Sequence, residues 1–430
     1  MQTEFTVPLF RLIFAVSEAT DLINRDLFNH HERVAYFSYK IGEVMGLSKK
    51  QLVNLSMAGA LHDIGAISIQ DRMELLSFEA SSGDSHQEIG AELLKDIPYF
   101  NDLSKYVLHH HLFWNDLSTA EQLDKETRRI ANILHLADRA AVAIDNSRGI
   151  LGQVPDIIKK IDNQSGTMFD PAIVDAFSVL SSNEYFWLDS VSPNLQLILE
   201  DMIGLQNKVI PLQGLLELAT VFSRIIDFRS AFTATHSSGV AAGAQEIAQK
   251  VGFSDGECIL MNIAGLVHDL GKLAVPNTIL EKPDKLSKSE FDVIRGHTYY
   301  TYRILDRIPA LNTVKHWAAF HHERMDGKGY PFHRNSFDLS LGSRILGVAD
   351  VFTAITEDRP YRNGMTSKAA LDILFSMANQ SAIDKDIVAI VERNFETINE
   401  ARIAAQQESR IEYTQATGRH TKKTPAPIYS

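Results

Sequence analysis

The chain has 430 residues, 45% of them hydrophobic, and a formal net charge of −12 with its histidines neutral. That length exceeds what one hydrophobic core usually organises, so two or three domains are expected. The acidic balance, together with the lack of any long Lys/Arg block, argues against a nucleic-acid polymer as partner. A single cysteine, Cys258, excludes an intramolecular disulfide framework and suits a reducing cytosol. Without a signal peptide or a run of about 18 apolar residues, the sequence predicts a cytoplasmic protein with no membrane partner.

Apolar residues recur at intervals of three and four along most of the chain, which predicts helices. Clear examples are residues 211–226, 238–251 and 367–377. Gly, Pro and Asp gather around residues 276–285 and 326–337, which indicates loops between helices. Strand-like alternation is scarce, so the predicted fold class is all-α.

The sequence also repeats itself, at an offset that grows from 206 to 212 residues across the polar positions. The matched positions, first copy before second, are His30 and His236, His62 and His268, Asp63 and Asp269, His86 and His297, His110 and His321, His111 and His322, Asp138 and Asp350. Short loop insertions would produce such a slow growth of the offset. We therefore expect two homologous helical domains in tandem.

The repeat suggests where the domains begin and end. Residues 1–204 form the first predicted domain and residues 205–408 the second, joined by a helix that extends from about residue 194 toward residue 210. Residues 409–430 are polar and end in a Pro-containing stretch, so we expect a disordered tail there.

The repeated residues of the second copy are five imidazoles and two carboxylates. This mixture, without thiolate, suits Fe, Mn or Zn more than a structural cysteine-type zinc site. Seven ligands are too many for one ion. Two ions about 3.5–4 Å apart could share them if one carboxylate bridges, and Asp269, adjacent to His268, is the natural bridge.

A structural interpretation competes with this one, because a single histidine on a helix is more often hydrogen-bonded than metal-bound. It would require every repeated polar residue to be useful on its own in a helical core, where burial without a partner costs a few kcal/mol. The recurrence of the whole set at nearly fixed spacing favours metal binding.

Four segments of the second copy resemble the signatures of HD-GYP domains, a branch of the HD superfamily. Residues 268–272 read HDLGK, similar to HD-x-GK, and residues 321–331 read HHERMDGKGYP, similar to HHE-x-x-DG-x-GYP. Residues 348–351 and 358–362 read VADV and DRPYR, which are similar to two further segments of the family. The resemblance extends from His236 to Arg362 and is specific.

The resemblance implies two tandem HD-type helical domains and a bacterial, metal-dependent cyclic dinucleotide phosphodiesterase. Its substrate would be cyclic di-GMP or 3′,3′-cyclic GMP-AMP. Two divalent ions are implied, Fe or Mn first, with Zn, Ni or Co as alternatives. The implied metal ligands are His236, His268, Asp269, His297, His321, His322 and Asp350. The resemblance also places Lys272 near the scissile phosphate, with Arg359 and Arg362 on the substrate phosphates.

Three departures from the family pattern bear on this site. Members with a third metal carry a glutamate where this chain has Phe232, so a binuclear site is expected. Thr301 replaces a glycine and Thr353 an aspartate of the pattern, which leaves the shape of the pocket and the nucleotide preference open.

The chemistry follows from the demands of a phosphodiester. Two ions would activate a water and stabilise charge on the phosphate oxygens, giving a linear dinucleotide with a 5′-phosphate. The predicted catalytic residues are Asp269 and Lys272, with Lys272 on the same helical face as His268, one turn later. Arg359 and Arg362, three residues apart, could hold one anion together, although such pairs also occur on solvated faces. Tyr330 could pack within its loop or contact a base.

The first copy keeps all seven polar residues, His30, His62, Asp63, His86, His110, His111 and Asp138, and could hold metal. It lacks the substrate residues. Ala66 stands in place of the lysine, residues 112–115 read LFWN, no GYP loop follows, and Ser147 and Ile150 lie opposite the arginines. A degenerate HD domain with a structural or regulatory role is favoured over a second enzyme.

Two other functions stay open. One is a nucleotidohydrolase that acts on mononucleotides, against which the GYP loop and the paired arginines argue. The other is a catalytically inactive metal-binding regulatory scaffold, against which the complete ligand set and Lys272 argue. A homodimer is compatible with the sequence, but no residue pattern establishes it.

Overall fold

The computed structural model describes residues 5–21, 29–66, 86–95, 97–119, 123–204, 209–227, 235–280, 282, 284–358 and 363–418. Among these residues the chain is helical except for loops and one small sheet, in which strand β1 (Thr6–Pro8) pairs with strand β2 (Val209–Pro211). The predicted all-α fold class is confirmed. The chain divides into two compact units, residues 8–209 and residues 210–430 with 1–7.

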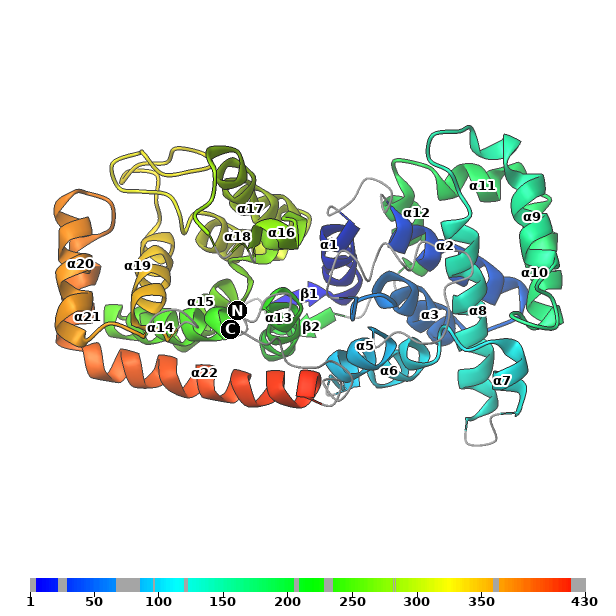
Figure 1. Ribbon diagram of the computed structural model, residues 1–430, viewed down its shortest axis with the longest axis horizontal. Helices are drawn as coiled ribbons and strands as arrows, with labels where there is room; N and C mark the ends of the chain where they lie inside the picture. Colours follow the sequence, from blue (N-terminus) through cyan, green and yellow to red (C-terminus); the bar gives the residue numbers. More distant parts are fainter. Residues whose placement is uncertain are drawn as a thin grey trace, which may run out of the picture. The chain divides into compact units, whose positions relative to one another are not determined.

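The N-terminal unit is built around helix α2, which packs against α3 and α8 (Figure 1). Its elements are α1 (Leu9–Asp21), α2 (His30–Val44), α3 (Lys49–Leu61), α5 (His86–Lys95), α6 (Asn101–Leu108), α7 (Trp114–Thr119), α8 (Lys125–Val142), η2 (Ile150–Gly152), α9 (Val154–Asp162), α10 (Pro171–Ser181), α11 (Glu184–Ser190) and α12 (Leu195–Ile203). Buried aromatic side chains, among them Phe37, Phe186 and Trp187, fill the space between α2 and α11.

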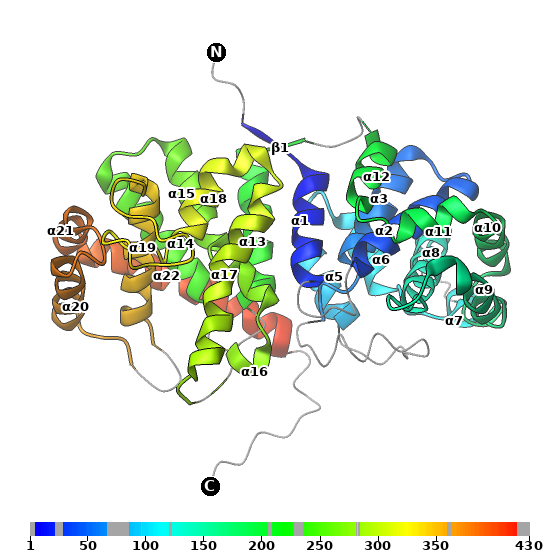
Figure 2. The same cartoon turned by 90° about the horizontal axis from the view of Figure 1, so that it is seen from above.

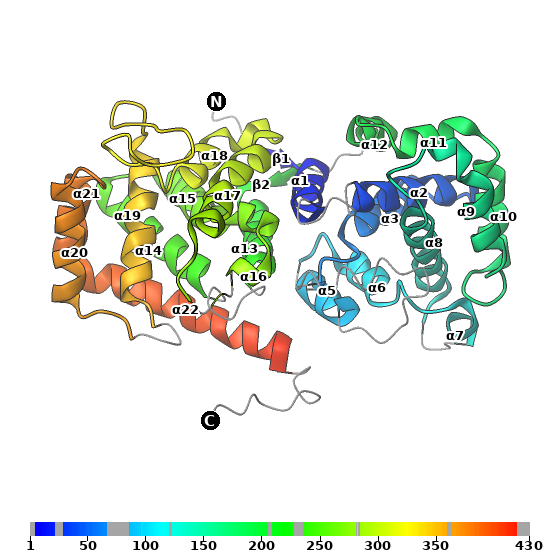
Figure 3. The same cartoon turned by 45° about the horizontal axis from the view of Figure 1, so that its top comes forward.

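The C-terminal unit is built around helix α14, which contacts α15, α19 and the long helix α22 (Figures 2 and 3). Its elements are α13 (Leu212–Asp227), α14 (His236–Val251), α15 (Asp255–Val267), η4 (Leu270–Ala274), α16 (Asn277–Leu280), α17 (Lys288–Asp306), η5 (Pro309–Leu311), α18 (Asn312–Ala319), α19 (Leu341–Thr356), α20 (Ser367–Asn379), α21 (Lys385–Arg393) and α22 (Phe395–Gly418). Within the described residues, no helix is long and apolar enough to cross a membrane.

The internal repeat extends to the way the helices begin. Ser48 and Ser254, 206 residues apart, each cap a helix by accepting a hydrogen bond from the backbone N–H three residues later. In return, the side chains of Gln51 and Glu257 accept from the backbone N–H of the serine. This reciprocal pair satisfies N–H groups that a helix start leaves without partners. It fixes the start of the two helices, α3 and α15, that end at the His-Asp pairs.

Three local expectations need correction. The helix expected to reach residue 210 ends at Ile203, because Gly204 follows with a positive φ of 60°. The loop expected over residues 276–285 includes the short helix α16. Residues 409–418, expected as part of a tail, continue α22 instead. Burial of Ser409 and a 2.5 Å ion pair between Arg224 and Glu412 hold that segment in place. Residues 419–430 lie outside the described residues.

Candidate metal centre

The seven candidate ligands of the second copy come together from the ends of three helices and from within two others. His236 begins α14, His268 and Asp269 follow the end of α15, and His321 and His322 follow α18. His297 and Asp350 project from within α17 and α19. Ligand atoms lie within 4.8 Å of one another in two separate groups, one of His236, His268 and Asp350 and one of His297, His321 and His322. A third group, of His268, Asp269 and His321, links these two groups.

The carboxylate of Asp269 lies between histidines of these two groups. Its Oδ2 is 3.1 Å from Nε2 of His268, and its Oδ1 is 3.3 Å from Nε2 of His297. Oδ1 is buried and, within the described part of the chain, has no hydrogen-bond donor. A carboxylate with one oxygen directed to each group is the geometry that a bridging ligand requires.

Local hydrogen bonds set the orientation of three of the rings. Nδ1 of His268 is 2.7 Å from the carbonyl of Gly265, and Nδ1 of His297 and of His321 is 2.6 Å from the carbonyl three residues before each. Because a carbonyl only accepts, Nδ1 carries a proton in each of these rings, which leaves Nε2 as the atom available to a metal. The Nε2 atoms are the ones that lie near Asp269 and one another, as metal-binding imidazoles need.

His236 is oriented by a carboxylate that the sequence analysis did not identify. Its Nδ1 is 3.2 Å from Oε2 of Glu357, and its Nε2 is 3.2 Å from Oδ1 of Asp350. Glu357 is buried, and its Oε2 also accepts a 3.0 Å hydrogen bond from Gln406 of α22. Its position immediately before the DRPYR segment was the only signal in the sequence.

The electrostatics of the centre favour bound cations. Burial alone would raise the pKa of Asp269, but His268 and Lys272 outweigh it and hold that pKa well below its usual range. Burial lowers the pKa of His297 to about 3, so this ring is neutral and its Nε2 lone pair is available. Burial also opposes a charge on His236, yet Glu357 and Asp350 raise its pKa to about 10. A divalent ion would take the place of that proton, so the residues present fit a metal site.

Lys272 lies at the exposed edge of the centre. The expectation that it shares a helical face with His268 is wrong, because α15 ends at Val267 and residues 270–274 form the 3-10 helix η4. Residues three apart eclipse in that helix type, which places Nζ of Lys272 2.6 Å from Oδ2 of Asp269. The Lys272 side chain is 22% exposed and that of Asp269 only 4%. Burial disfavours the ammonium, but Asp269 outweighs it and raises the pKa of Lys272.

The loop after the His-His pair is held by Glu323. Its carboxylate accepts hydrogen bonds from the backbone N–H groups of Phe332 and Arg334, at 2.7 and 2.9 Å. Gly329 is required here, because a Cβ would lie 2.4 Å from the backbone N of Arg324. With the loop held in this way, the centroid of the Tyr330 ring lies 5.0 Å from the centroid of the His322 ring.

The sequence analysis also did not identify Arg295, a positively charged side chain beside this loop. The guanidinium carbon of Arg295, on α17, is 5.0 Å from the centroid of the Tyr330 ring. Arg295 lies two residues before His297 and has no motif of its own, so only the tertiary structure identifies it. Together with Lys272 it adds positive charge close to the candidate centre.

Two of the three departures from the family pattern, Thr301 and Thr353, lie within the described residues. Thr301 is buried, donates a 3.0 Å hydrogen bond to the carbonyl of His268 and accepts one of 2.9 Å from the N–H of Gly271. It therefore fastens η4 to α17. Thr353 is buried within α19. Arg359, Arg362 and Phe232 lie outside the described residues.

The first copy gathers its seven residues in the same way, and all of them are buried. Asp63, His86, His110 and His111 form one group of ligand atoms, and His30, His62 and Asp63 form another. Nε2 of His30 is 3.4 Å from Oδ1 of Asp138.

Family comparisons agree with this repeat. Two family models, each described as an HD domain, match residues 27–143 and residues 220–387. A solved structure, a cyclic GMP-AMP specific phosphodiesterase of Vibrio cholerae named V-cGAP3, shares the fold. Its TM-score is 0.63 at 23% identity, covering 94% of this chain and 98% of that one.

The curated relatives are phosphodiesterases. 3′3′-cGAMP-specific phosphodiesterase 1 of Vibrio cholerae is 28% identical, over 93% of this chain and 95% of its own length. 3′3′-cGAMP-specific phosphodiesterase 3 of the same organism is 27% identical, over 90% and 95%. A cyclic di-GMP phosphodiesterase of Pseudomonas aeruginosa is 40% identical, over 33% of this chain and 34% of its own length. The chain belongs to the HD-domain family, in the class of metal-dependent phosphodiesterases. It is a tandem member, with an HD-GYP-type second domain and a degenerate HD domain before it.

Proposed function

We propose that the second domain hydrolyses a cyclic dinucleotide, with 3′,3′-cyclic GMP-AMP preferred over cyclic di-GMP, to a linear dinucleotide with a 5′-phosphate. The observation that carries the proposal is the position of Asp269. This buried carboxylate directs its two oxygens to histidines of two separate groups, and Lys272 stands at its exposed side. A shared carboxylate of this kind can hold two ions close together, as a two-ion phosphodiesterase requires, and Lys272 adds a positive charge beside it.

The preference between the two dinucleotides rests on how far each similarity extends. Two relatives that match this chain over 90% or more of its length, phosphodiesterases 1 and 3 of Vibrio cholerae, are both 3′3′-cGAMP-specific. The cyclic di-GMP phosphodiesterase of Pseudomonas aeruginosa matches only 33% of it. The similarity to these two relatives therefore includes the first domain, which supports cyclic GMP-AMP as the substrate, although 3′3′-cGAMP-specific phosphodiesterase 2 of the same organism matches only 41% of this chain.

Two divalent ions, Fe or Mn, would be held by the candidate ligands. His236, His268 and Asp350 form one half of the proposed centre, and His297, His321 and His322 the other, with Asp269 shared. When bound, the ions supply a water of lowered pKa and neutralise charge on the phosphate oxygens.

The remaining residues bind and orient the substrate. Lys272 offers an ammonium close to Asp269, where it can stabilise charge that develops on the phosphate or on the leaving 3′-oxygen. Tyr330 offers a ring face to a base, and Arg295, over that ring, offers a guanidinium to an adjacent phosphate. Arg359 and Arg362 stay in the proposal as phosphate contacts on the strength of the DRPYR segment.

The test is turnover of both dinucleotides and of mononucleotides with Mn²⁺ or Fe²⁺, with the product identified by mass spectrometry. We expect His268→Ala/Asp269→Ala to abolish hydrolysis, whereas His62→Ala/Asp63→Ala retains most of it. Circular dichroism would show whether each variant is folded. Loss of turnover in a folded first-domain variant, or hydrolysis of mononucleotides alone, would contradict the proposal. Metal-dependent turnover of a dinucleotide would rule out the inactive scaffold.

A further inference from the structure

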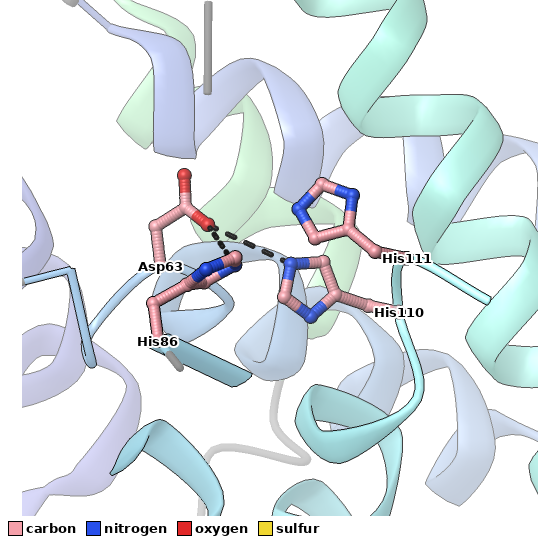
Figure 4. A group of neighbouring side chains, drawn as sticks. All are labelled: Asp63, His86, His110 and His111. Atoms are coloured by element: carbon pink, nitrogen blue, oxygen red, sulfur yellow. Dashed lines mark ion pairs between the residues drawn. The ribbon is translucent and has the colours of Figure 1, made fainter. Parts of the chain in front are cut away.

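A compact cluster of possible ligands lies within the N-terminal unit, apart from the proposed catalytic centre. Asp63, His86, His110 and His111 are 6%, 3%, 0% and 1% exposed. Figure 4 shows one carboxylate oxygen of Asp63 directed at the rings of His86 and His110. Oδ1 of Asp63 is 3.6 Å from Nε2 of each. One ligand atom from each of the four residues lies within 4.8 Å of the others.

These buried atoms have no hydrogen-bond partner within the described part of the chain. They are Oδ1 of Asp63, Nε2 of His110 and both ring nitrogens of His86 and His111. Leaving a buried polar group unpaired costs about 1–3 kcal/mol. Each ring can direct only one of its nitrogens to a given point, so the four residues together offer four ligand atoms to one common partner. His110 is prepared for a cation, because its Nδ1 donates to the carbonyl of Val107 at 2.6 Å and leaves the Nε2 lone pair toward Asp63.

The other half of this domain's site differs in charge from its counterpart. Oδ2 of Asp138 accepts hydrogen bonds from Nη2 and Nε of the buried Arg139, at 2.5 and 3.1 Å. The second copy has Val351 in the position of Arg139. Glu357, which contacts His236, matches Asp145 in the first copy. Asp145 is exposed and accepts from Ser147 instead. Compared with the corresponding half in the second domain, this half has an added guanidinium, that of Arg139, and Asp145 is exposed where the matching Glu357 is buried.

We propose that the N-terminal domain binds one divalent ion, through Asp63, His86, His110 and His111, and that the Arg139 guanidinium occupies the electrostatic role of a second ion at Asp138. Three imidazoles and one carboxylate suit Zn²⁺ or Fe²⁺. Four protein ligands complete a tetrahedral ion and leave no position for water or substrate, as in structural sites. In the second domain, by contrast, the His322 side chain is 32% exposed. The ion therefore stabilises the fold of the first domain and does not bind or activate a substrate there.

Metal content of the full chain tests this proposal independently of any activity. His268→Ala/Asp269→Ala/His321→Ala disrupts the catalytic centre, and after incubation with Zn²⁺ or Fe²⁺ we expect this variant to retain about one ion per chain. Adding Asp63→Asn/His110→Gln should remove that ion, whereas adding His109→Gln, a change at the neighbouring histidine outside the cluster, should not. A chelator should lower the melting temperature of the triple variant, and Zn²⁺ should restore it.

Arg139→Gln keeps the proposal testable if the ligand variants fail to fold. Without the guanidinium, Oδ2 of Asp138 and the adjacent histidines can accept a second cation. When Arg139→Gln is added to the triple variant, the metal content should therefore rise to about two ions per chain. A triple variant that holds no ion above background would overturn the metal site. Two ions in that variant, or an unchanged content in Arg139→Gln, would overturn the role assigned to Arg139.

Discussion

Oε2 of Glu357 lies 3.2 Å from Nδ1 of His236, while Nε2 of the same ring faces Asp350. Glu357 is in turn held by Gln406 on α22. The long C-terminal helix therefore reaches the candidate centre through two side chains. A carboxylate on the outer nitrogen of a metal-binding histidine fixes the ring and increases its basicity.

Glu357→Ala should weaken metal binding at the half of the centre that contains His236. Loss of such an outer partner typically costs about 10–100-fold in metal affinity. Glu357→Gln, which keeps an acceptor for Nδ1, should recover part of it. Metal titration by calorimetry measures the change, and Glu396→Gln, an exposed glutamate at the start of α22, is the matched control. Equal affinities for Glu357→Ala and the control would show that Glu357 does not support the centre.

Lys272→Met should lower kcat for the dinucleotide by about 10²–10³-fold, because one charged group that stabilises the transition state is removed. Metal content should not fall, since the lysine competes with a cation for Asp269 and does not hold one. Steady-state kinetics and metal analysis on one preparation separate the two effects. Lys328→Met, at a side chain that is 81% exposed, should leave both quantities unchanged. Loss of metal together with activity would show that Lys272 helps to form the metal site and would contradict its catalytic role.

Arg295→Ala should raise KM for the dinucleotide with little change in kcat or metal content, because the guanidinium over Tyr330 would contact substrate and not the reacting atoms. Arg303→Ala is a close control, since Arg303 is on the same helix and lies 5.2 Å from the ring of Tyr299. The measurement is a comparison of KM for wild type and the two variants. A KM that changes equally in both would mean that Arg295 contributes only general positive charge.

Gly271→Ala should destabilise the C-terminal domain by about 1–3 kcal/mol or more, because overpacking forces backbone to move. A Cβ at this position would lie 1.9 Å from the carbonyl oxygen of His297. Gly256→Ala, near the start of α15 with nothing within 4 Å of its Cβ, should instead stabilise by about 0.5–1 kcal/mol. Urea denaturation measures both. Changes of the same sign would contradict the close packing of η4 against α17.

The sequence was informative wherever a local pattern or the repeat determined the answer. Helical periodicity predicted the fold class, and the paired histidines and aspartates predicted which side chains would meet. Glu357 and Arg295 could not be found in this way, because each acts through a partner far away in sequence. Lys272 was placed on the wrong kind of turn, since periodicity does not distinguish a continuing α-helix from a 3-10 turn. The end of α22 depended on a contact with Arg224, which no pattern within the segment reveals.

The hydrogen bond from a histidine Nδ1 to the carbonyl three residues earlier occurs in both domains, for example at His62 with Gly59 and at His268 with Gly265. The orientation of these rings is thus encoded by a few adjacent residues of their own helix. After a gene duplication, one copy could lose its lysine, its loop and its arginines while these imidazoles kept their orientation. The orientation of these rings therefore requires neither the lysine nor the GYP loop nor the arginines, so a domain that lacks all three can still present its imidazoles to an ion, as we propose for the first domain.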